Sequence, residues 1–378
     1  MNLSQQDRDW VSSALEKITG KMMPVTERTK DKVPYTAIDG VFDDRSGSDD
    51  IAWWTNGFWG GIMWQLFSVT GEPLYKETAI KLEEKLDAVL MNPEGLDHDN
   101  GFKWLPTAVA HYRIDRNQKS RNRALLAADN LAGRFNLSGN FIRAWNDWGE
   151  DDHRGYAIID CMMNLPLLYW ASEVTQDPRF KQIAEAHAVT AGKYFVREDG
   201  SVSHIVEFDP FTGEMRKTHG GQGYGEGSSW TRGQSWGLYG FVLSYIHTGE
   251  VYYLHTARKI AHYFISNIPE NGLIPVDFRQ PETCTWEDST AAAIAACGLI
   301  EIAKNTEGRD SQVYLNWALK LLKALEQERC CWDHKTDNLL KKCTAAYHDK
   351  THEFSIIYGD YYFIEAVCKL SGKGIFIW

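Results

Sequence analysis

Two aspartates lie in sequence surroundings that would let their carboxyl groups act together as an acid and a base. Asp160 follows the apolar-rich residues 156–159 and precedes Cys161, so its carboxyl group is set within an apolar run. Burial raises the pKa of a carboxyl group, and a carboxyl that keeps its proton near neutral pH can serve as a general acid. Asp99 is the natural second carboxylate, because two carboxyls in one pocket push each other's pKa values apart. The pair predicts proton-transfer chemistry.

Asp99 and Asp160 belong to a set of four acidic positions at the starts of predicted helices, which also includes Asp288 and Asp360. Taken alone, each can instead be a helix N-cap or a first-turn residue, because a carboxylate there accepts backbone N–H groups and suits the helix dipole. The apolar neighbours of Asp160 set it apart from the other three.

A second segment whose residues could bind a ligand is Ser-Trp-Thr-Arg-Gly-Gln-Ser-Trp-Gly at residues 229–237, with Gly-Gly-Gln-Gly upstream at residues 220–223. Arg232 lies there at a predicted helix start, between two tryptophans. A guanidinium can clamp a carboxylate through two parallel hydrogen bonds while an indole supports a sugar ring. The alternative is that Trp230 and Trp236 belong to the core and that Arg232 pairs with an aspartate on the rim.

The residues that could bind a metal ion lack the spacing of a metal site. Four histidines are isolated in the sequence and are expected to be hydrogen-bonded rim residues rather than ligands: His98, His153, His204 and His219. The seven cysteines are scattered and odd in number, and several lie in apolar stretches, which predicts reduced, buried thiols. We therefore expect no metal site.

Composition narrows the function classes. The 378 residues include 15 Trp, 17 Tyr and 16 Phe, which favours an aromatic-lined cleft of the kind that binds sugars. The net charge of -11 and the lack of a long basic run argue against a nucleic-acid partner. Residues 1–21 are polar, and no window approaches the ~20 apolar residues of a membrane span, so we expect a soluble, cytoplasmic protein. The sequence does not indicate an oligomeric state.

The elements that must position these residues follow a repeated pattern. An apolar helical run, a short break such as Thr-Gly-Glu, and a second, amphipathic helix recur along the chain, and each unit predicts an antiparallel helical hairpin. The predicted helices are residues 4–18, 57–70, 74–90, 105–112, 120–135, 160–175, 179–194, 233–248, 251–265, 288–306, 314–325 and 355–370. Twelve helices of uneven repeat length favour an all-α toroid, with six inner helices ringed by six outer ones, formed by residues 1–378 as one domain. The long, polar and aromatic loops that lead into the inner helices should share one rim and carry the function.

Five motifs occur in an order that is specific when taken together. They are residues 97–102 (Asp-His-Asp-Asn-Gly-Phe), 158–168, 230–237, 288–292 (Asp-Ser-Thr-Ala-Ala) and 359–362 (Gly-Asp-Tyr-Tyr). From about Trp53 to Ala366 the chain resembles the unsaturated glucuronyl hydrolases of glycoside hydrolase family 88. The resemblance implies an (α/α)6 barrel, in agreement with the helix count, and no cofactor.

The resemblance also implies a reaction. Water would add across the C4=C5 double bond of the 4,5-unsaturated uronic acid that polysaccharide lyases leave at the non-reducing end of oligosaccharides. The expected substrates are glycosaminoglycan disaccharides. The hemiketal that forms would open and release the adjacent sugar. Because the anomeric carbon is not attacked, the carboxyl-separation rule of ordinary glycosidases does not apply.

Residue roles follow from matching motif positions. Asp160 matches the acid/base that protonates C4, and Asp99 matches the assisting carboxylate. The family commonly has Asp-His-His-Asp where this chain has Asp97-His98-Asp99, one residue shorter. The residues that match substrate-contacting positions are Trp54, Asn56, His98, Trp145, His204, Gln222, Arg232 and Trp236.

Alternatives to this function remain at the level of sequence. A related unsaturated rhamnogalacturonyl hydrolase would have the same barrel but a pectin-derived substrate, and a sugar-binding protein or an epimerase could have the same toroid without hydrolysis. Residues 341–350, with Lys341, Lys342, His348 and Lys350, could meet a sulfate on the second sugar or could be a solvated charged loop.

Overall fold

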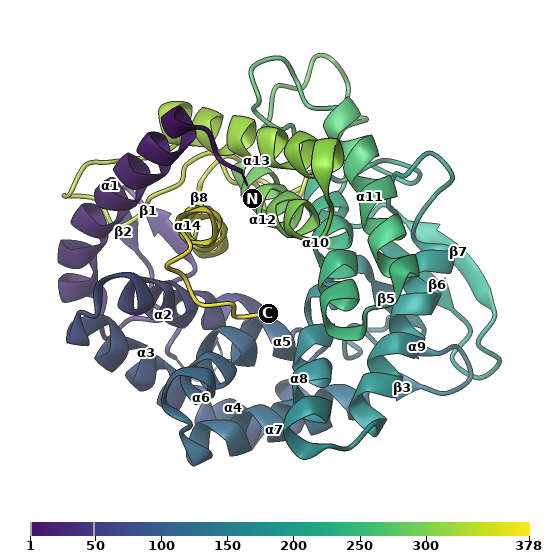
Figure 1. The fold of residues 1–378 in the computed structure, drawn as a ribbon. Coiled ribbons are helices and arrows are strands. Elements are labelled where there is room, and N and C mark those ends of the chain that lie inside the picture. The colour runs from purple at the N-terminus through teal and green to yellow at the C-terminus, as the bar shows by residue number, and fades with distance from the viewer. Residues whose placement is uncertain (1, 48–49) are drawn as a thin grey trace.

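The chain folds into a ring of two concentric layers of helices, described by a computed structural model for residues 2–47 and 50–378 (Figure 1). Within those residues the outer layer consists of α1 (Gln5–Thr29), α3 (Pro73–Lys85), α7 (Gln118–Gly133), α9 (Arg179–Tyr194), α11 (Val251–Ser266) and α13 (Gly308–Glu328). The inner layer alternates with it along the chain and consists of α2 (Phe58–Thr70), α5 (Asn100–Trp104) with α6 (Ala110–Asp115), α8 (Leu165–Thr175), α10 (Thr231–Thr248), α12 (Ser289–Lys304) and α14 (Ile357–Ser371). This alternation confirms the predicted all-α class and (α/α)6 barrel.

Short turns with special backbone chemistry join the helices into hairpins. Gly71 follows α2 with a φ of 72°, and its N–H closes the last turn onto the carbonyl of Phe67. Pro73 then opens α3 in the first turn, where its missing N–H would have had no helical partner. Gly249 ends α10 in the same way, with a φ of 76°. Because these connections are so short, consecutive helices must run antiparallel.

The two layers differ in how much of each helix is buried. In α12 every residue from Ser289 to Ala303 is buried, because the helix packs against outer helices on one side and against inner helices on the other. In α13 the buried residues recur on one face only, and the opposite face is charged and solvated. The inner helices are therefore a rigid frame for whatever lies at their ends.

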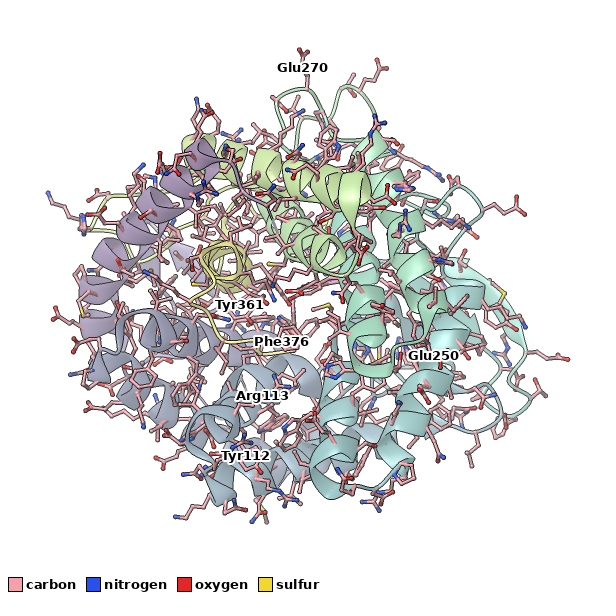
Figure 2. The ribbon with its side chains drawn as sticks, in the orientation of Figure 1. Tyr112, Arg113, Glu250, Glu270, Tyr361 and Phe376 are labelled. Carbon is pink, nitrogen blue, oxygen red and sulfur yellow. The ribbon has the colours of Figure 1, made fainter. Side chains whose placement is uncertain are left out.

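The ring is closed at α14, which packs against α1, α2 and α12. Beyond α14, residues 372–378 turn into the centre of the ring, where Figure 2 places Phe376 near Arg113 and Tyr361. The Arg113 guanidinium donates hydrogen bonds to the carbonyl oxygens of Phe376 and Ile377 at 2.7 and 2.6 Å. The indole of Trp378 stacks on Tyr362, with ring centroids 5.8 Å apart. This segment fills the middle of the barrel.

All twelve predicted helices are present, with shifted ends. The first runs to Thr29, and the third is divided into α3 and α4 (Asp87–Leu90). The helix predicted at 105–112 starts at Asn100 and passes through a π-helical turn at Leu105–Val109. Asp160 does not begin a helix but lies in a 3-10 turn at Ile159–Met163, because Pro166 fits only in the first turn of the helix that follows.

In the part of the chain that the structure describes, three small antiparallel sheets, which the sequence analysis does not predict, lie between the helices. They consist of β1 (Thr36–Ile38), β2 (Val41–Phe42) and β8 (Ser355–Ile356); of β3 (Phe135–Asn136) and β4 (Phe141–Ile142); and of β5 (Tyr156–Ile158), β6 (Ile205–Phe208) and β7 (Met215–His219). The first and third sheets join loops that lead into different inner helices, so they fix those loops relative to one another, whereas β3 and β4 form a hairpin within the connection from α7 to α8.

Two further expectations can be compared with the fold. All seven cysteines are free thiols and five of them are buried, as predicted. Among the described residues, no helix has both the length and the apolar character that crossing a membrane requires.

Candidate active site

A cavity of about 410 Å³ opens among the loops that lead into the inner helices. This volume lies in the range of small-molecule binding sites. The residues that line the cavity are Ala52, Trp53, Trp54, Gly95, Asp97, His98, Asp99, Trp145, Trp148, Ile158, Asp160, His204 and Gln222. They come from the loops before α2, α5, α8 and α10, which agrees with the predicted functional rim.

Strand pairing brings Asp160 and His204 together although they are far apart in sequence. Strand β5 pairs with β6 so that Ile158 faces Ile205, and the N–H of Ile159 donates to the carbonyl of His204 at 3.1 Å. Each functional side chain lies at the adjoining end of its strand, and His204 Nε2 is 3.7 Å from Asp160 Oδ2. The small sheet is therefore the element that assembles this part of the cavity.

The imidazole of His204 is held in one protonation state. The backbone N–H of Gln222 donates to His204 Nδ1 at 3.0 Å, which leaves the ring proton on Nε2, facing Asp160. Burial and the nearby charge of Arg232 lower the pKa of His204 to about 3, so the ring is neutral at physiological pH. Gly221 permits this contact, because its φ is +55° and a Cβ there would lie 1.9 Å from His204 Nδ1.

Asp160 has the properties of a carboxyl group that keeps its proton near neutral pH. Burial raises its pKa to about 7, although the charge of Arg232 and the indole N–H of Trp236 act in the opposite direction. Among the described residues, Oδ2 has no hydrogen-bond partner, and the side chain is 14% exposed, toward the cavity. A buried, unpartnered oxygen on a group that titrates near pH 7 is a candidate proton donor.

Asp99 stands at the N-cap position of α5, but its side chain does not cap that helix. Its Oδ1 instead accepts a hydrogen bond of 3.1 Å from Nδ2 of Asn164. Burial and the charge of Asp97 raise the pKa of Asp99 well above its ordinary value, the charge of Lys103 opposes this, and the charge of Asp160 adds to it. The charge of Asp160 therefore acts on the Asp99 carboxyl group, so a proton on Asp160 favours ionisation of Asp99.

Aromatic side chains form the walls of the cavity around this pair. Trp54 packs at a ring-centroid distance of 5.4 Å against Phe102 of α5, and Trp145 lies 5.2 Å from Trp148. Trp148 stacks on the ring of His153 at 3.8 Å and is 51% exposed, so one face of its indole is available to a ligand. Such flat apolar surfaces suit the faces of sugar rings.

Seven of the ten residues that the sequence analysis assigned to the site line the cavity, and three do not. The seven are Trp54, His98, Asp99, Trp145, Asp160, His204 and Gln222. Asn56 lies behind the wall, where its Nδ2 donates to the carbonyls of Asp50 and Ile51, each at 2.9 Å. Trp236 is completely buried beside Asp160.

Arg232 follows the alternative that the sequence left open. Its side chain is 1% exposed, and its Nη1 lies 3.0 Å from Oδ2 of Asp288. The guanidinium also donates to the carbonyls of Thr344 and Ala345 and lies 4.4 Å above the ring of Trp230. A guanidinium with these partners supplies positive charge behind the cavity, whereas the predicted two-pronged clamp on a ligand would need free Nη atoms.

Some cavity residues were not assigned from the sequence. Asp97, Trp53 and Trp148 line the cavity, but the sequence motifs do not assign a role to Asp97 and do not distinguish these two tryptophans from the other 13. The feature of the sequence that points to Trp148 as a cavity residue is its position in the polar loop before β5. The loop of residues 341–350 does not line the cavity, and Lys342 Nζ pairs there with Glu353 at 2.7 Å.

Comparison with known proteins agrees with this geometry. The sequence model of Glycosyl Hydrolase Family 88 matches residues 15–378. The chain belongs to glycoside hydrolase family 88. It is therefore an enzyme of the glycosidase class, as the sequence motifs predicted.

Individual members of the family are similar over most of their length. The unsaturated glucuronyl hydrolase of Bacillus sp. is 38% identical over 327 residues, which cover 84% of this chain and 86% of the relative. The unsaturated chondroitin disaccharide hydrolase of Streptococcus pneumoniae is 32% identical, with 96% and 92% of the two chains covered. The crystal structure of an unsaturated glucuronyl hydrolase from Streptococcus agalactiae superposes with a TM-score of 0.91 at 29% identity, covering 100% of this chain and 95% of that one.

Proposed function

We propose that this chain hydrates the C4=C5 double bond of the 4,5-unsaturated uronic acid at the non-reducing end of lyase-generated glycosaminoglycan disaccharides. The products are the keto-uronate and the adjacent sugar. The observation that carries the proposal is the Asp160 carboxyl group, which lines a cavity with tryptophan walls, has a buried Oδ2 without a hydrogen-bond partner among the described residues, and has a pKa raised by burial to about 7. Membership of family 88 and the names of the relatives support the substrate class.

The first step is protonation of the double bond. Protonated Asp160 donates its proton to C4, and the π electrons of the C4=C5 bond form the new C–H bond. The ring oxygen shares the positive charge that is left at C5. Ionised Asp99 stabilises this charge, because a carboxylate fixed in a cavity of low polarity acts strongly on charge that develops nearby.

The second step is the addition of water. Water attacks C5 and passes a proton to the Asp160 carboxylate, which restores the acid for the next turnover. The hemiketal that forms breaks its bond between C5 and the ring oxygen, which leaves a ketone at C5. The open-chain hemiacetal at C1 then expels the adjacent sugar as an alcohol and becomes an aldehyde.

Other cavity residues bind and orient the substrate. Trp54, Trp145 and Trp148 offer aromatic faces to the sugar rings, and the neutral His204 presents an N–H beside Asp160. Gln222 lines the cavity, and the buried charge of Arg232 lies close enough to Asp160 to affect its pKa. The charge of Arg232 thus offsets part of the negative charge that the aspartates bring to the cavity.

We place the reaction in the cytoplasm and in one catalytic domain of residues 1–378. Seven free thiols favour a reducing compartment. One continuous buried cluster extends from Val11 to Trp378, which supports a single domain.

The test is the substitution Asp160→Asn, assayed by the loss of ultraviolet absorbance of the conjugated double bond in unsaturated chondroitin disaccharide. We expect turnover to fall by roughly a thousandfold or more while binding, measured by calorimetry, is retained. Asp129→Asn is the matched control, because Asp129 is an exposed outer-layer residue whose ion-pair partner among the described residues is Arg179, at 3.1 Å. An Asp160→Asn enzyme with normal turnover would contradict the proposal.

A parallel assay distinguishes the pectin alternative. Unsaturated rhamnogalacturonan disaccharide should be a poorer substrate than the chondroitin disaccharide, and the reverse order would assign the enzyme to pectin fragments. Tight binding of either disaccharide without consumption of the double bond would indicate a binding protein.

A further inference from the structure

Asn164 connects the two segments that carry the paired carboxyl groups. It lies between the 3-10 turn that contains Asp160 and the start of α8, and its side chain is fully buried. Its Oδ1 accepts the N–H of Phe102 at 2.8 Å. Its Nδ2 donates to Oδ1 of Asp99 at 3.1 Å and to the backbone carbonyl of Asp160 at 3.3 Å. Every polar atom of this amide is therefore used between the two segments.

Close packing prevents the amide from turning away. A Cβ at Gly101 would lie 2.5 Å from Cα of Asn164 and 2.7 Å from its Oδ1, so the backbones of the two segments are in direct contact there. With Oδ1 fixed by the N–H of Phe102, the NH₂ group can point only toward Asp99 and the carbonyl of Asp160. The hydrogen bond between Asn164 and Asp99 is therefore fixed by the packing around it.

The chemistry of this contact distinguishes the two protonation states of Asp99. An amide N–H is a donor only, so it bonds well to an unprotonated carboxylate oxygen. The titratable groups that interact with the Asp99 carboxyl are Asp97, His98, Lys103, Arg134, Asp160 and Cys161. The charges of Asp97 and Asp160 disfavour an ionised Asp99, and Lys103 favours it. The hydrogen bond from Asn164 favours an ionised Asp99, as the charge of Lys103 does, and it also has a fixed direction.

We propose that Asn164 is a positioning residue that keeps the negative charge on Asp99 and thereby the shared proton on Asp160. The inference rests on the proposed function for its consequence in catalysis. Two interacting carboxyls that hold one proton have two arrangements, and only the one with the proton on Asp160 can protonate C4. Asn164 bonds to Asp99 in that productive arrangement.

The experiment compares Asn164→Ala and Asn164→Asp with the wild-type enzyme and with Asn100→Ala. Asn100 is an equally buried asparagine of α5, but its Nδ2 bonds to Ala127 and Asn130 of the outer layer. The measurements are kcat and KM across pH on unsaturated chondroitin disaccharide, and a ¹³C NMR titration of the Asp99 carboxyl, assigned by its loss in Asp99→Asn.

Loss of the amide N–H should raise the pKa of Asp99 and stabilise the arrangement with the proton on Asp99. We expect both Asn164 variants to lose roughly ten- to hundredfold in maximal kcat with little change in KM, and to show pH profiles shifted toward higher pH. Asn164→Asp should shift the profile further, because a carboxylate there adds negative charge beside Asp99. Asn100→Ala should lower the melting temperature and leave the profile in place.

A purely structural role predicts the opposite order. Asn164→Asp keeps the size of the side chain and the acceptor for Phe102, so it would be the milder variant, with an unshifted profile, and that result would overturn the proposal. An unshifted Asp99 carboxyl in the NMR titration would also overturn it, whether or not the disaccharide is consumed. If neither variant folds, Asn164→Ser, which fits the same space, gives the same readouts. A wild-type enzyme that leaves the disaccharide intact would instead contradict the proposed function.

Discussion

Two parts of the rim each carry an aspartate at the start of a predicted helix and use it differently. Asp288 is the N-cap of α12, where its carboxylate accepts from Thr290 and Thr344 and pairs with Arg232. Asp160 instead lines the cavity, and its buried Oδ2 has no hydrogen-bond partner among the described residues. We call the part of the rim around Asp160 the open half and the part around Asp288 the closed half. The position of an acid at a helix start therefore does not distinguish structure from chemistry, whereas the partners of its oxygens do.

The pKa values alone would also have confused the two halves. Burial raises the pKa of Asp360 to about 7, the same value as for Asp160. Both oxygens of Asp360 accept backbone N–H groups, from Leu339 at 3.0 Å and Leu340 at 2.6 Å, and the residue does not line the cavity. A raised pKa marks burial, and only access to a cavity turns it into a candidate for catalysis.

The largest expected effect comes from removing a charge on the closed half. Asp288→Asn should lower the free energy of unfolding by about 3–5 kcal/mol, because the Arg232 guanidinium would be left buried without a counter-ion. Urea denaturation measures this, with Asp160→Asn as the matched variant on the open half. The comparison fails if Asp288→Asn is as stable as the wild type.

The pH dependence of stability should sharpen the contrast. In the folded protein the pKa of Asp160 is raised to about 7 from 3.8, so the native state binds the proton more tightly than the unfolded state, and this group costs stability as pH rises through that window. Asp160→Asn removes the cost. We expect the variant to gain up to roughly 4 kcal/mol above pH 7 and almost nothing near pH 4. Melting temperatures across pH test this, and a gain that does not depend on pH would contradict it.

A glycine on the open half provides a third comparison. Gly221→Ala should cost about 2 kcal/mol of stability, because the backbone is left-handed there and the new Cβ would collide with His204. The displaced imidazole no longer faces Asp160, so kcat should fall as well. Gly249→Ala is the control, since its left-handed turn has open space around it and no contact with the cavity. Equal kcat in both variants would show that the contact with His204 is dispensable.

The aromatic walls predict an effect on binding without one on folding. Trp148→Ala should raise KM by about tenfold, with kcat and melting temperature nearly unchanged, because the indole is half exposed and packs mainly on His153. Trp230→Ala should instead lower the melting temperature, since Trp230 is buried against both Arg232 and His204. A lower melting temperature of the Trp148→Ala variant would contradict the assignment of Trp148 to ligand binding rather than to folding.

The smallest effect is expected in the charged loop of residues 341–350. Lys342→Gln should change the free energy of unfolding by less than about 1 kcal/mol, because its ion pair with Glu353 is partly exposed to solvent. Turnover of sulfated and unsulfated disaccharides should fall together or stay the same. A selective loss for the sulfated substrate would assign this loop to sulfate binding.

Much of the architecture could be predicted because its signals are local. Glycine and proline mark the ends of the hairpins, and the apolar run around Asp160 correctly indicated a buried carboxyl. What could not be predicted depends on partners far along the chain. Arg232 meets Asp288 only after folding, and β5 is too short to be recognised before it pairs with β6. Trp148 differs from the buried tryptophans only in its exposure, which the sequence does not encode locally.

The closure of the ring at α14 has a consequence for how the molecule comes apart. In an open stack of hairpins the terminal units have one neighbour each and can fray in turn. Here α14 contacts α1 and α2 at one side and α12 at the other, so every hairpin has two neighbours. Unfolding any one hairpin opens the ring and exposes the buried inner helices to water. We expect the protein to unfold on heating in one cooperative transition. Limited proteolysis should yield few partly digested fragments.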